Sequence, residues 1–130
     1  IGGNASGKGI VNISTDSLWN LKTSSTNAQL LQVGVLGAGE LNITTGGIVK
    51  ARDTQIALND KSKGDVRVDG QNSLLETFNM NVGTTGTGTL TLTNNGTLNV
   101  EGGEVYLGVF EPAGKRRLST VWQILKFLRE

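Results

Sequence analysis

The chain lacks several residue types on which enzymes and metal sites commonly depend. Its 130 residues include no cysteine, no histidine and a single proline, and only 5% are aromatic. Without histidine the commonest general base and metal ligand is missing, and without cysteine there are no thiol nucleophiles, zinc thiolates or disulfides. We therefore expect no enzymatic activity, no catalytic or metal-binding residues and no cofactor.

Long hydrophobic runs are also missing. No apolar stretch approaches about 18 residues, and no basic segment followed by an apolar run opens the sequence. We expect neither a signal peptide nor a membrane-spanning helix here. If the protein is secreted, this chain is a piece of something longer.

Charge and glycine usage divide the chain into two unlike parts. Residues 1–114 hold 7 Lys and Arg against 10 Asp and Glu, a net charge of −3, whereas residues 115–130 hold 5 against 1, a net charge of +4. All 19 glycines precede residue 115. We place a domain boundary between Gly114 and Lys115. Because the basic residues are confined to the tail, the overall charge is no evidence for nucleic acid, and we expect no nucleic-acid partner.

What the sequence does contain is an internal repeat. Four apolar residues recur at intervals of 25, 24 and 25, each followed by a residue type that readily takes a positive φ. A second series, the glycines that precede alternating apolar and polar stretches, recurs at 30, 25 and 24. Such a period indicates one coil of a solenoid. The two series are Val33-Gly34, Leu58-Asn59, Val82-Gly83 and Leu107-Gly108, and Gly9, Gly39, Gly64 and Gly88.

Each coil contains three short stretches with period-two alternation, which predict half-buried strands separated by turn residues. Ile1 and Gly3 take the third-pair positions of an incomplete leading coil. The first inward pairs are Val11/Ile13, Leu41/Ile43, Val66/Val68 and Leu90/Leu92. The second are Trp19/Leu21, Val49/Ala51, Leu74/Glu76 and Leu98/Val100, and the third are Leu31/Val33, Ile56/Leu58, Met80/Val82 and Val105/Leu107.

Two places depart from this register. The first coil holds extra polar residues around 22–29, which predict a loop. Glu76 falls at an inward position, where an unpaired carboxylate is costly, so we expect a local bulge or corner that turns it outward. The pattern predicts an all-β, parallel β-helix of about four coils over residues 1–114.

Two stretches carry a family resemblance. Residues 33–47 (VGVLGAGELNITTGG) and 82–96 (VGTTGTGTLTLTNNG) resemble the repeat of autotransporter passenger domains, the type V secreted adhesins and autoaggregation proteins of Gram-negative bacteria. The resemblance implies that the parallel β-helix is right-handed and is displayed at the cell surface by an outer-membrane barrel that this chain lacks. It implies a virulence-related function in adhesion, autoaggregation or biofilm formation, with surface glycans, proteins or further copies as partners. It assigns no ligand-binding residue.

The tail does not continue the repeat, because the next strand would place Arg116 inward. Residues 115–130 predict a short basic amphipathic helix with Val121, Ile124, Leu125 and Leu128 on one face. Three interpretations remain: a native cap over the open end of the solenoid, an out-of-frame or truncated extension, or an amphipathic helix that lies on a membrane surface.

Few candidate sites stand out. Glu40 and Asp65 occupy equivalent outward positions on adjacent coils, a spacing that retaining glycosidases use, although a solvated pair balanced by Lys63 and Arg67 is the simpler interpretation. We place Lys8 and Thr89 on either side of that pair. Outward Asn12, Asn42, Thr44, Thr91 and Thr93 predict a polar row along one sheet. The stretches 37–39 and 86–88 predict solenoid corners rather than phosphate loops, and 115–117 a solvated helix entry.

From the sequence, the expected function is that of a non-enzymatic fragment of a surface autotransporter adhesin, associated with the outer membrane in the full-length protein. The alternative is a phage tailspike or polysaccharide-degrading β-helix. Loss of polysaccharide cleavage on removing Glu40 or Asp65 would favour the alternative.

Overall fold

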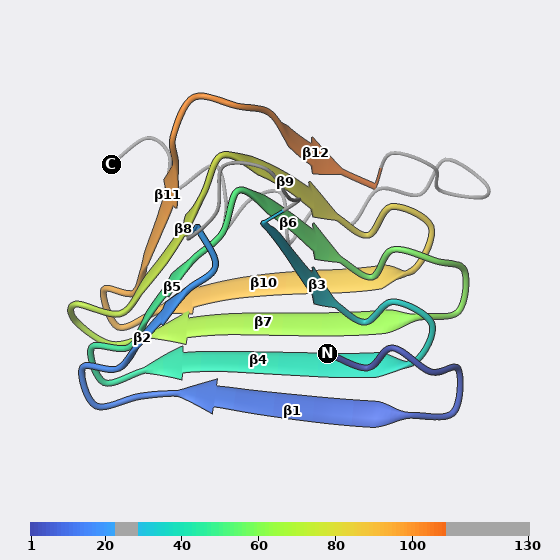
Figure 1. Ribbon diagram of the computed structural model, residues 1–130, viewed down its shortest axis with the longest axis horizontal. Helices are drawn as coiled ribbons and strands as arrows, with labels where there is room; N and C mark the ends of the chain where they lie inside the picture. Colours follow the sequence, from blue (N-terminus) through green and yellow to red (C-terminus); the bar gives the residue numbers. More distant parts are fainter. Residues whose placement is uncertain (23–28, 109–130) are drawn as a thin grey trace.

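Three parallel sheets run along the chain, and each turn contributes one strand to every sheet in order (Figure 1). The computed structural model describes residues 1–22 and 29–108, and within these ranges all regular structure is β-strand. Every pairing is parallel and joins a strand to its counterpart one turn away. The predicted parallel β-helix is confirmed, with four layers of strands connected by about three full turns.

Sheet A holds the longest strands, and its predicted register is confirmed. Gly9 pairs with Gly39, Gly39 with Gly64, and Gly64 with Gly88. Glycine is needed in this column because a Cβ on Gly39 would lie 2.3 Å from the Gly34 amide nitrogen. The strands are β1 (Lys8–Ile13), β4 (Ala38–Thr44), β7 (Lys63–Asp69) and β10 (Thr87–Thr93).

Sheet B corrects the predicted register of the third coil. Leu75, not Leu74, pairs with Val49 and is fully buried, so Glu76 points outward beside Lys50. No bulge within the strand is needed, because the preceding turn is one residue longer than its counterparts and shifts the whole strand. The strands are β2 (Leu18–Asn20), β5 (Ile48–Lys50), β8 (Leu74–Thr77) and β11 (Thr97–Val100).

Sheet C corrects the second coil. Ile56 pairs with Val33, so the inward pair is Thr54/Ile56 rather than Ile56/Leu58. The left-handed residue after the strand is accordingly Ala57, with φ of 57°, and not Asn59. Two extra residues lie in the corner that follows. The strands are β3 (Leu30–Val33), β6 (Asp53–Ile56), β9 (Asn79–Val82) and β12 (Val105–Leu107).

The first residues also differ from the prediction. The carbonyl of Ile1 accepts a hydrogen bond of 2.8 Å from the Gly34 amide, and the amino terminus donates to the Gln32 carbonyl at 2.9 Å. Gly2 has φ of 68°, close to the 74° of Gly34. Ile1 is therefore the counterpart of Val33 and Gly2 of Gly34, whereas a Cβ on Gly3 would meet no atom of the described residues within 4 Å.

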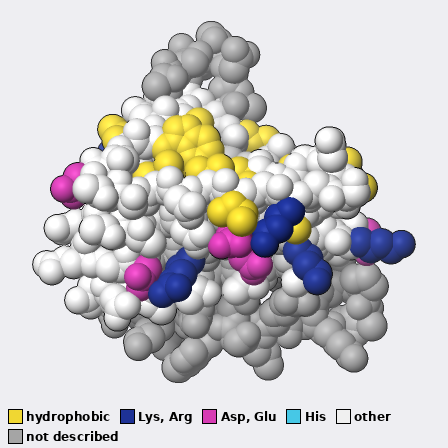
Figure 2. Space-filling view, turned by 90° about the horizontal axis from the view of Figure 1, so that it is seen from below, with side chains coloured by type: hydrophobic (Ala, Val, Ile, Leu, Met, Phe, Trp, Pro, Cys, Tyr) yellow, Lys and Arg dark blue, Asp and Glu magenta, His cyan; other side chains and the backbone are white. Residues whose placement is uncertain are grey.

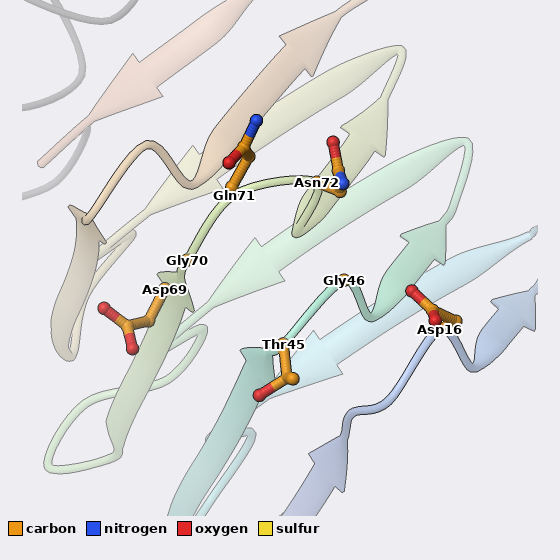
Figure 3. A pocket seen from close by; sticks show the side chains of 7 residues that line it. All are labelled: Asp16, Thr45, Gly46, Asp69, Gly70, Gln71 and Asn72. Carbon is orange, nitrogen blue, oxygen red and sulfur yellow. The ribbon is translucent and has the colours of Figure 1, made fainter.

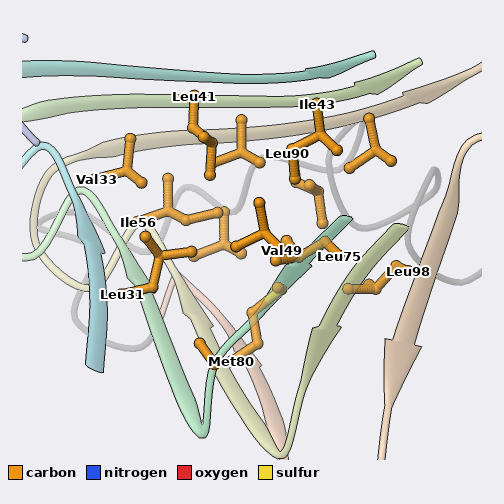
Figure 4. Packing of buried hydrophobic residues seen from close by; sticks show 14 residues of the cluster. Leu31, Val33, Leu41, Ile43, Val49, Ile56, Leu75, Met80, Leu90 and Leu98 are labelled. Atoms are coloured by element: carbon orange, nitrogen blue, oxygen red, sulfur yellow. The ribbon is translucent and has the colours of Figure 1, made fainter. Parts of the chain in front are cut away.

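The core fills the space between the sheets (Figure 4). Its side chains are less buried in the first layer than in the second. Leu41 and Ile43 in the second layer are 0% exposed, but Val11, Ile13 and Trp19 at equivalent positions in the first layer are only partly buried. A coil thus buries its apolar side chains by stacking on its neighbours.

Several sequence-based predictions fall outside the described residues. These are most of the 22–29 loop, the boundary at residues 114 and 115, the basic triplet 115–117, and the C-terminal helix as either cap or extension.

Candidate functional site

The clearest hollow on the described part of the molecule lies where sheet A turns into sheet B (Figure 3). Its volume is about 470 Å³, and turns from three successive layers line it. Figure 3 shows Asp16 and Asp69 on opposite sides of the turn at Thr45 and Gly46, so their carboxylates do not converge. The lining residues are Asp16, Thr45, Gly46, Asp69, Gly70, Gln71 and Asn72.

Tight turns with left-handed backbone shape this hollow. Thr45 and Gly46 have φ of 50° and 80°, and the Gly47 amide donates to the Thr44 carbonyl at 2.9 Å. Two consecutive positive φ values closed by such a bond define a type I′ turn, which favours Asn, Asp and Gly. Thr15 and Asp16 repeat the arrangement in the first layer, and Asn94 and Asn95 in the fourth.

The turn of the third layer is not of this type, and it begins at a carboxylate, Asp69, that several neighbouring side chains contact. Asp69 Oδ1 accepts hydrogen bonds from the Thr93 hydroxyl at 2.6 Å and the Asn94 amide at 2.8 Å, and Arg67 lies 3.5 Å away. The Thr93 and Asn94 hydrogen bonds, with the charge of Arg67, hold the pKa of Asp69 below its ordinary value of 3.8. Asp69 is therefore ionised and links the third layer to the fourth by hydrogen bonds, and it is not placed to donate a proton.

These residues do not form a metal centre. Within the described ranges, no three Asp or Glu side chains gather closely enough to hold an ion. Asp69 is already engaged by neighbouring side chains, and Asp16 comes from a turn two layers away. The expectation of no metal-binding residue stays a prediction for the chain as a whole.

A second charged cluster lies over sheet B and was missed in the sequence. Lys22 Nζ lies 3.1 Å from Glu76 Oε1 and 2.5 Å from Glu101 Oε2, while Lys50 Nζ is 3.6 Å from Glu76. Partial burial raises the pKa of Glu76, but the hydrogen bond and charge of Lys22 and the charge of Lys50 outweigh it, so the pKa falls below its ordinary 4.5. The sequence did indicate that Glu76 turns outward, but it did not indicate which side chains pair with it.

For Lys22 the same contacts act in the opposite direction. Partial burial lowers its pKa, and hydrogen bonds to Glu101 and Glu76 raise it further than burial lowers it, above the ordinary 10.5. Lys22 and Glu76 thus both remain charged near neutral pH. Their cluster links the first layer of the solenoid to the third and fourth layers.

The structure brings Glu40 and Asp65 together in register, as predicted, but not in a catalytic setting. Ile10, which is 51% exposed, is the first-layer neighbour of Glu40, whereas the prediction had placed Lys8 there; Lys8 pairs with Ala38. The Asn42 amide donates to Glu40 at 2.9 Å and to Asn12 Oδ1 at 2.9 Å. Glu40 is therefore part of a polar column along the sheet.

Sheet C carries a comparable polar column that the sequence did not reveal. Gln32, Gln55 and Asn81 are stacked in register, with Tyr106 above them in the fourth layer. The Gln32 amide donates to Gln55 Oε1 at 2.9 Å. The sequence did not reveal this column because the predicted register of the second coil was shifted by two residues toward the C-terminus. On the described residues, polar side chains mainly bond along the stack.

The glycine-containing stretches 37–39 and 86–88 lie at solenoid corners and the starts of β4 and β10, as predicted. A Cβ on Gly37 would lie 2.1 Å from the Asn4 carbonyl oxygen, and one on Gly86 would lie 2.6 Å from that of Asn59. These glycines therefore permit close approach of one coil to the next.

Comparison with known proteins finds a similar protein from Escherichia coli. The chain is similar to a protein named uncharacterized lipoprotein YdeK of Escherichia coli strain K12, with 97% identity over 101 residues. The match spans 78% of this chain and about 8% of that protein. No family model matches the chain, and no solved structure matches it.

The comparison corrects the identification made from the repeat. The matching protein is named a lipoprotein, not an autotransporter, and the absence of a family match leaves the passenger-domain resemblance without support. The adhesin function, with its autotransporter secretion and virulence role, is therefore wrong, and the tailspike or polysaccharide-degrading alternative has no support either. The physical reason is that a glycine-rich coil of about 25 residues specifies a solenoid, and one fold serves many functions.

The name lipoprotein points to a membrane-associated location for the relative, not to secretion through an autotransporter barrel. Over the residues that the structure describes, no helix has the length and hydrophobicity required to cross a membrane.

Proposed function

We propose that this chain is a non-catalytic structural segment, a solenoid spacer, of a membrane-associated lipoprotein. Its work is to extend and stiffen the polypeptide so that other parts of the longer protein are held at a fixed distance. The described residues contribute packing and cross-layer hydrogen bonds, and their ionised groups form pairs between coils.

One observation carries this proposal: equivalent positions stack directly on one another through four layers. In sheet A, Val11, Leu41, Val66 and Leu90 form one such column. Each layer adds about 4.8 Å of length and repeats the same backbone bonds, so the coil is an extendable unit.

Side-chain pairing supports a structural role over a catalytic one. Glu40, Asp69 and Glu76 each contact residues of an adjacent coil or of their own sheet. Catalytic carboxylates face a substrate site, whereas these are engaged along the solenoid surface. A lack of enzymatic activity is part of the proposal.

We infer the location from the name of the relative. A lipoprotein is membrane-associated, and we place this segment on the outward-facing side of the envelope, where a spacer would project its neighbours. Surface glycans, proteins or further copies remain predicted partners of the longer protein.

Deleting one whole coil tests the spacer function. Removal of residues 39–63 joins Ala38 to Gly64 and leaves every remaining strand opposite an equivalent partner. We expect this variant to keep its far-ultraviolet β signal and cooperative melting, and to shorten by about 4.8 Å in small-angle scattering.

The matched control removes residues 39–50, which deletes β4 and β5 but keeps β6. This variant leaves sheets A and B without their second-layer strands, so it should lose cooperative melting. If both deletions damage the fold equally, the coil is not an independent unit and the spacer function is wrong.

A further inference from the structure

The first layer leaves one edge of the solenoid open. β1 and β2 each pair with one strand, β4 and β5, and within the described residues nothing pairs with their other edges. Figure 2, seen from the side on which β1 lies, shows hydrophobic side chains in a patch with charged side chains beside it. The half-buried residues of this layer are Val11, Ile13, Trp19 and Leu21.

This edge has little of the protection that exposed strands usually carry. β1 reads Lys8-Gly9-Ile10-Val11-Asn12-Ile13, with one charge, no proline and no bulge in its pairing. Leu18 on β2 is 58% exposed. Flat, apolar edges of this kind accept another strand readily.

The chain itself already occupies one corner of this edge. The Gly34 and Val35 amides donate to the carbonyls of Ile1 and Gly2, and the Ala38 amide donates to the Gly7 carbonyl at 3.0 Å. Val33 beneath this segment is 0% exposed. Residues 1–7 therefore cover the corner after β3 as a preceding coil would.

A corner of the same length recurs two coils later, after β6, and identifies residues 1–9 as a corner of the solenoid. Ile1 to Gly9 spans eight positions, as does Ile56 to Gly64, and Gly2 and Ala57 both have positive φ. The Gly7 amide donates to the Asn4 carbonyl, as the Ser62 amide donates to that of Asn59. Residues 1–9 thus have the conformation of a corner that follows a third strand.

A second copy of the chain does not fit this edge. Its β12 would have to place Leu107 at the position next to Val33, because Leu107 is the equivalent residue of the fourth layer. That position is held by Ile1 through two backbone hydrogen bonds. A strand that runs directly into Ile1, in contrast, continues along β3 without displacing any of the described residues.

We propose that the open edge of β1, β2 and β3 is the seat of a further coil of the same polypeptide, which enters the solenoid through Ile1. This inference rests on the proposed spacer function and names the partner of its first layer. The relative, of which the match spans about 8%, provides ample length for such a coil. The coil would bury Val11, Ile13 and Trp19 as the first and third layers bury Leu41, Ile43 and Val49 between them.

The test adds a coil to the full chain. Residues 39–55 are duplicated and fused before Ile1, so that Gln55 precedes Ile1 as it precedes Ile56 in the native second coil. The matched control fuses residues 38–54, which has the same length but shifts every side chain to the opposite face. Both are made with Trp122→Phe, which leaves Trp19 as the one tryptophan.

The in-register extension should raise Tm by at least about 4 °C relative to the parent. It should shift Trp19 emission to shorter wavelength and slow hydrogen exchange of the β1 amides by about tenfold or more. The shifted control should leave all three at the parent values.

Equal behaviour of the extension and the control, including failure of both to order, overturns the proposed seat. If the parent self-associates with concentration in light scattering and the in-register extension does not stop it, the occupant is a second copy and the inference is wrong. If the variant that lacks residues 39–63 still melts cooperatively, the spacer function is supported even when either of these results overturns the proposed seat. Failure of the seat can therefore be distinguished from failure of the spacer function.

Discussion

The first and second layers of the solenoid contain the same kinds of residue in the same positions but bury them differently. Ile43 in the second layer is 0% exposed, whereas Ile13, directly opposite in the first layer, is only half-buried. Leu92 in the fourth layer, in the same column, is likewise only partly buried. The difference shows that a coil does not form its own core. Its stability depends on having a neighbour on each side, and the following changes test that dependence.

The largest expected effect separates an inner isoleucine from an outer one. Ile43→Asp places a charge between Ile13 and Val68 with no water available, so it should destabilise the fold by about 4 kcal/mol or more. Ile13→Asp should cost less, about 1–2 kcal/mol, because its carboxylate can reach solvent. Urea denaturation followed by circular dichroism measures both. Equal losses would mean that the first layer is as enclosed as the second.

A pair of glycines sharpens the comparison at the corners. Gly34 and Gly83 hold equivalent positions with φ of 74° and 68°, so alanine suffers the same backbone strain at both. A Cβ on Gly34 would lie 2.1 Å from the Lys63 carbonyl oxygen, while for Gly83 the nearest atom among the described residues is 3.3 Å away. Gly34→Ala should therefore cost about 3 kcal/mol and Gly83→Ala about 1 kcal/mol. Thermal melts that rank them in the other order would contradict the close approach of the inner coils.

The charged cluster over sheet B joins outer layers to an inner one, and it predicts that the stability of the fold depends on pH. The pKa of Glu76 is lowered in the folded protein, so its contribution is fully present above its ordinary value near 4.5 and is lost as pH falls through the lower folded pKa. Glu76→Gln should cost about 1 kcal/mol at pH 7 and nothing below that range. Denaturation at several pH values checks this. A Glu76→Gln effect that persists unchanged at low pH would show that charge is not its cause.

The smallest effect is expected at Ala57, the equivalent of Gly34 in the second coil. Its φ of 57° strains an alanine, and glycine would relieve that strain while adding freedom to the unfolded chain. Ala57→Gly should change stability by less than about 1 kcal/mol, in either direction. A large loss in calorimetry would indicate that the Ala57 methyl group is a packing element of the core.

Sheet A was predictable from sequence because its strands share a glycine and an unbroken alternation. Sheets B and C were predictable in number and order but not in every register. Leu74 and Leu75 are both apolar, so the alternation could not show that the preceding turn has an extra residue. Ile56 and Leu58 are two positions apart and fit the same alternation, which concealed the longer corner that follows Ile56.

Two buried polar residues contributed to those errors. Thr54 and Thr77 lie inside the solenoid with their hydroxyls 3.0 Å apart, and Thr77 donates onward to the Asn79 carbonyl at 2.7 Å. A hydroxyl with a partner can occupy a core position, but that partner is invisible until the coils are stacked. The charged cluster of Lys22, Glu76 and Glu101 was unpredictable for the same reason, since its members are far apart in sequence.

The most direct test of in-register stacking uses the absence of native cysteine. Gln32→Cys with Gln55→Cys places thiols on directly paired residues of adjacent coils, about 4.8 Å apart along the stack. Gln32→Cys with Asp53→Cys is the control, two residues out of register on the same strands and more than about 7 Å apart. Mass spectrometry after mild oxidation should find an intramolecular disulfide in the first variant and free thiols in the second. A disulfide in the control variant alone, or in neither, would contradict the stacking on which this account rests.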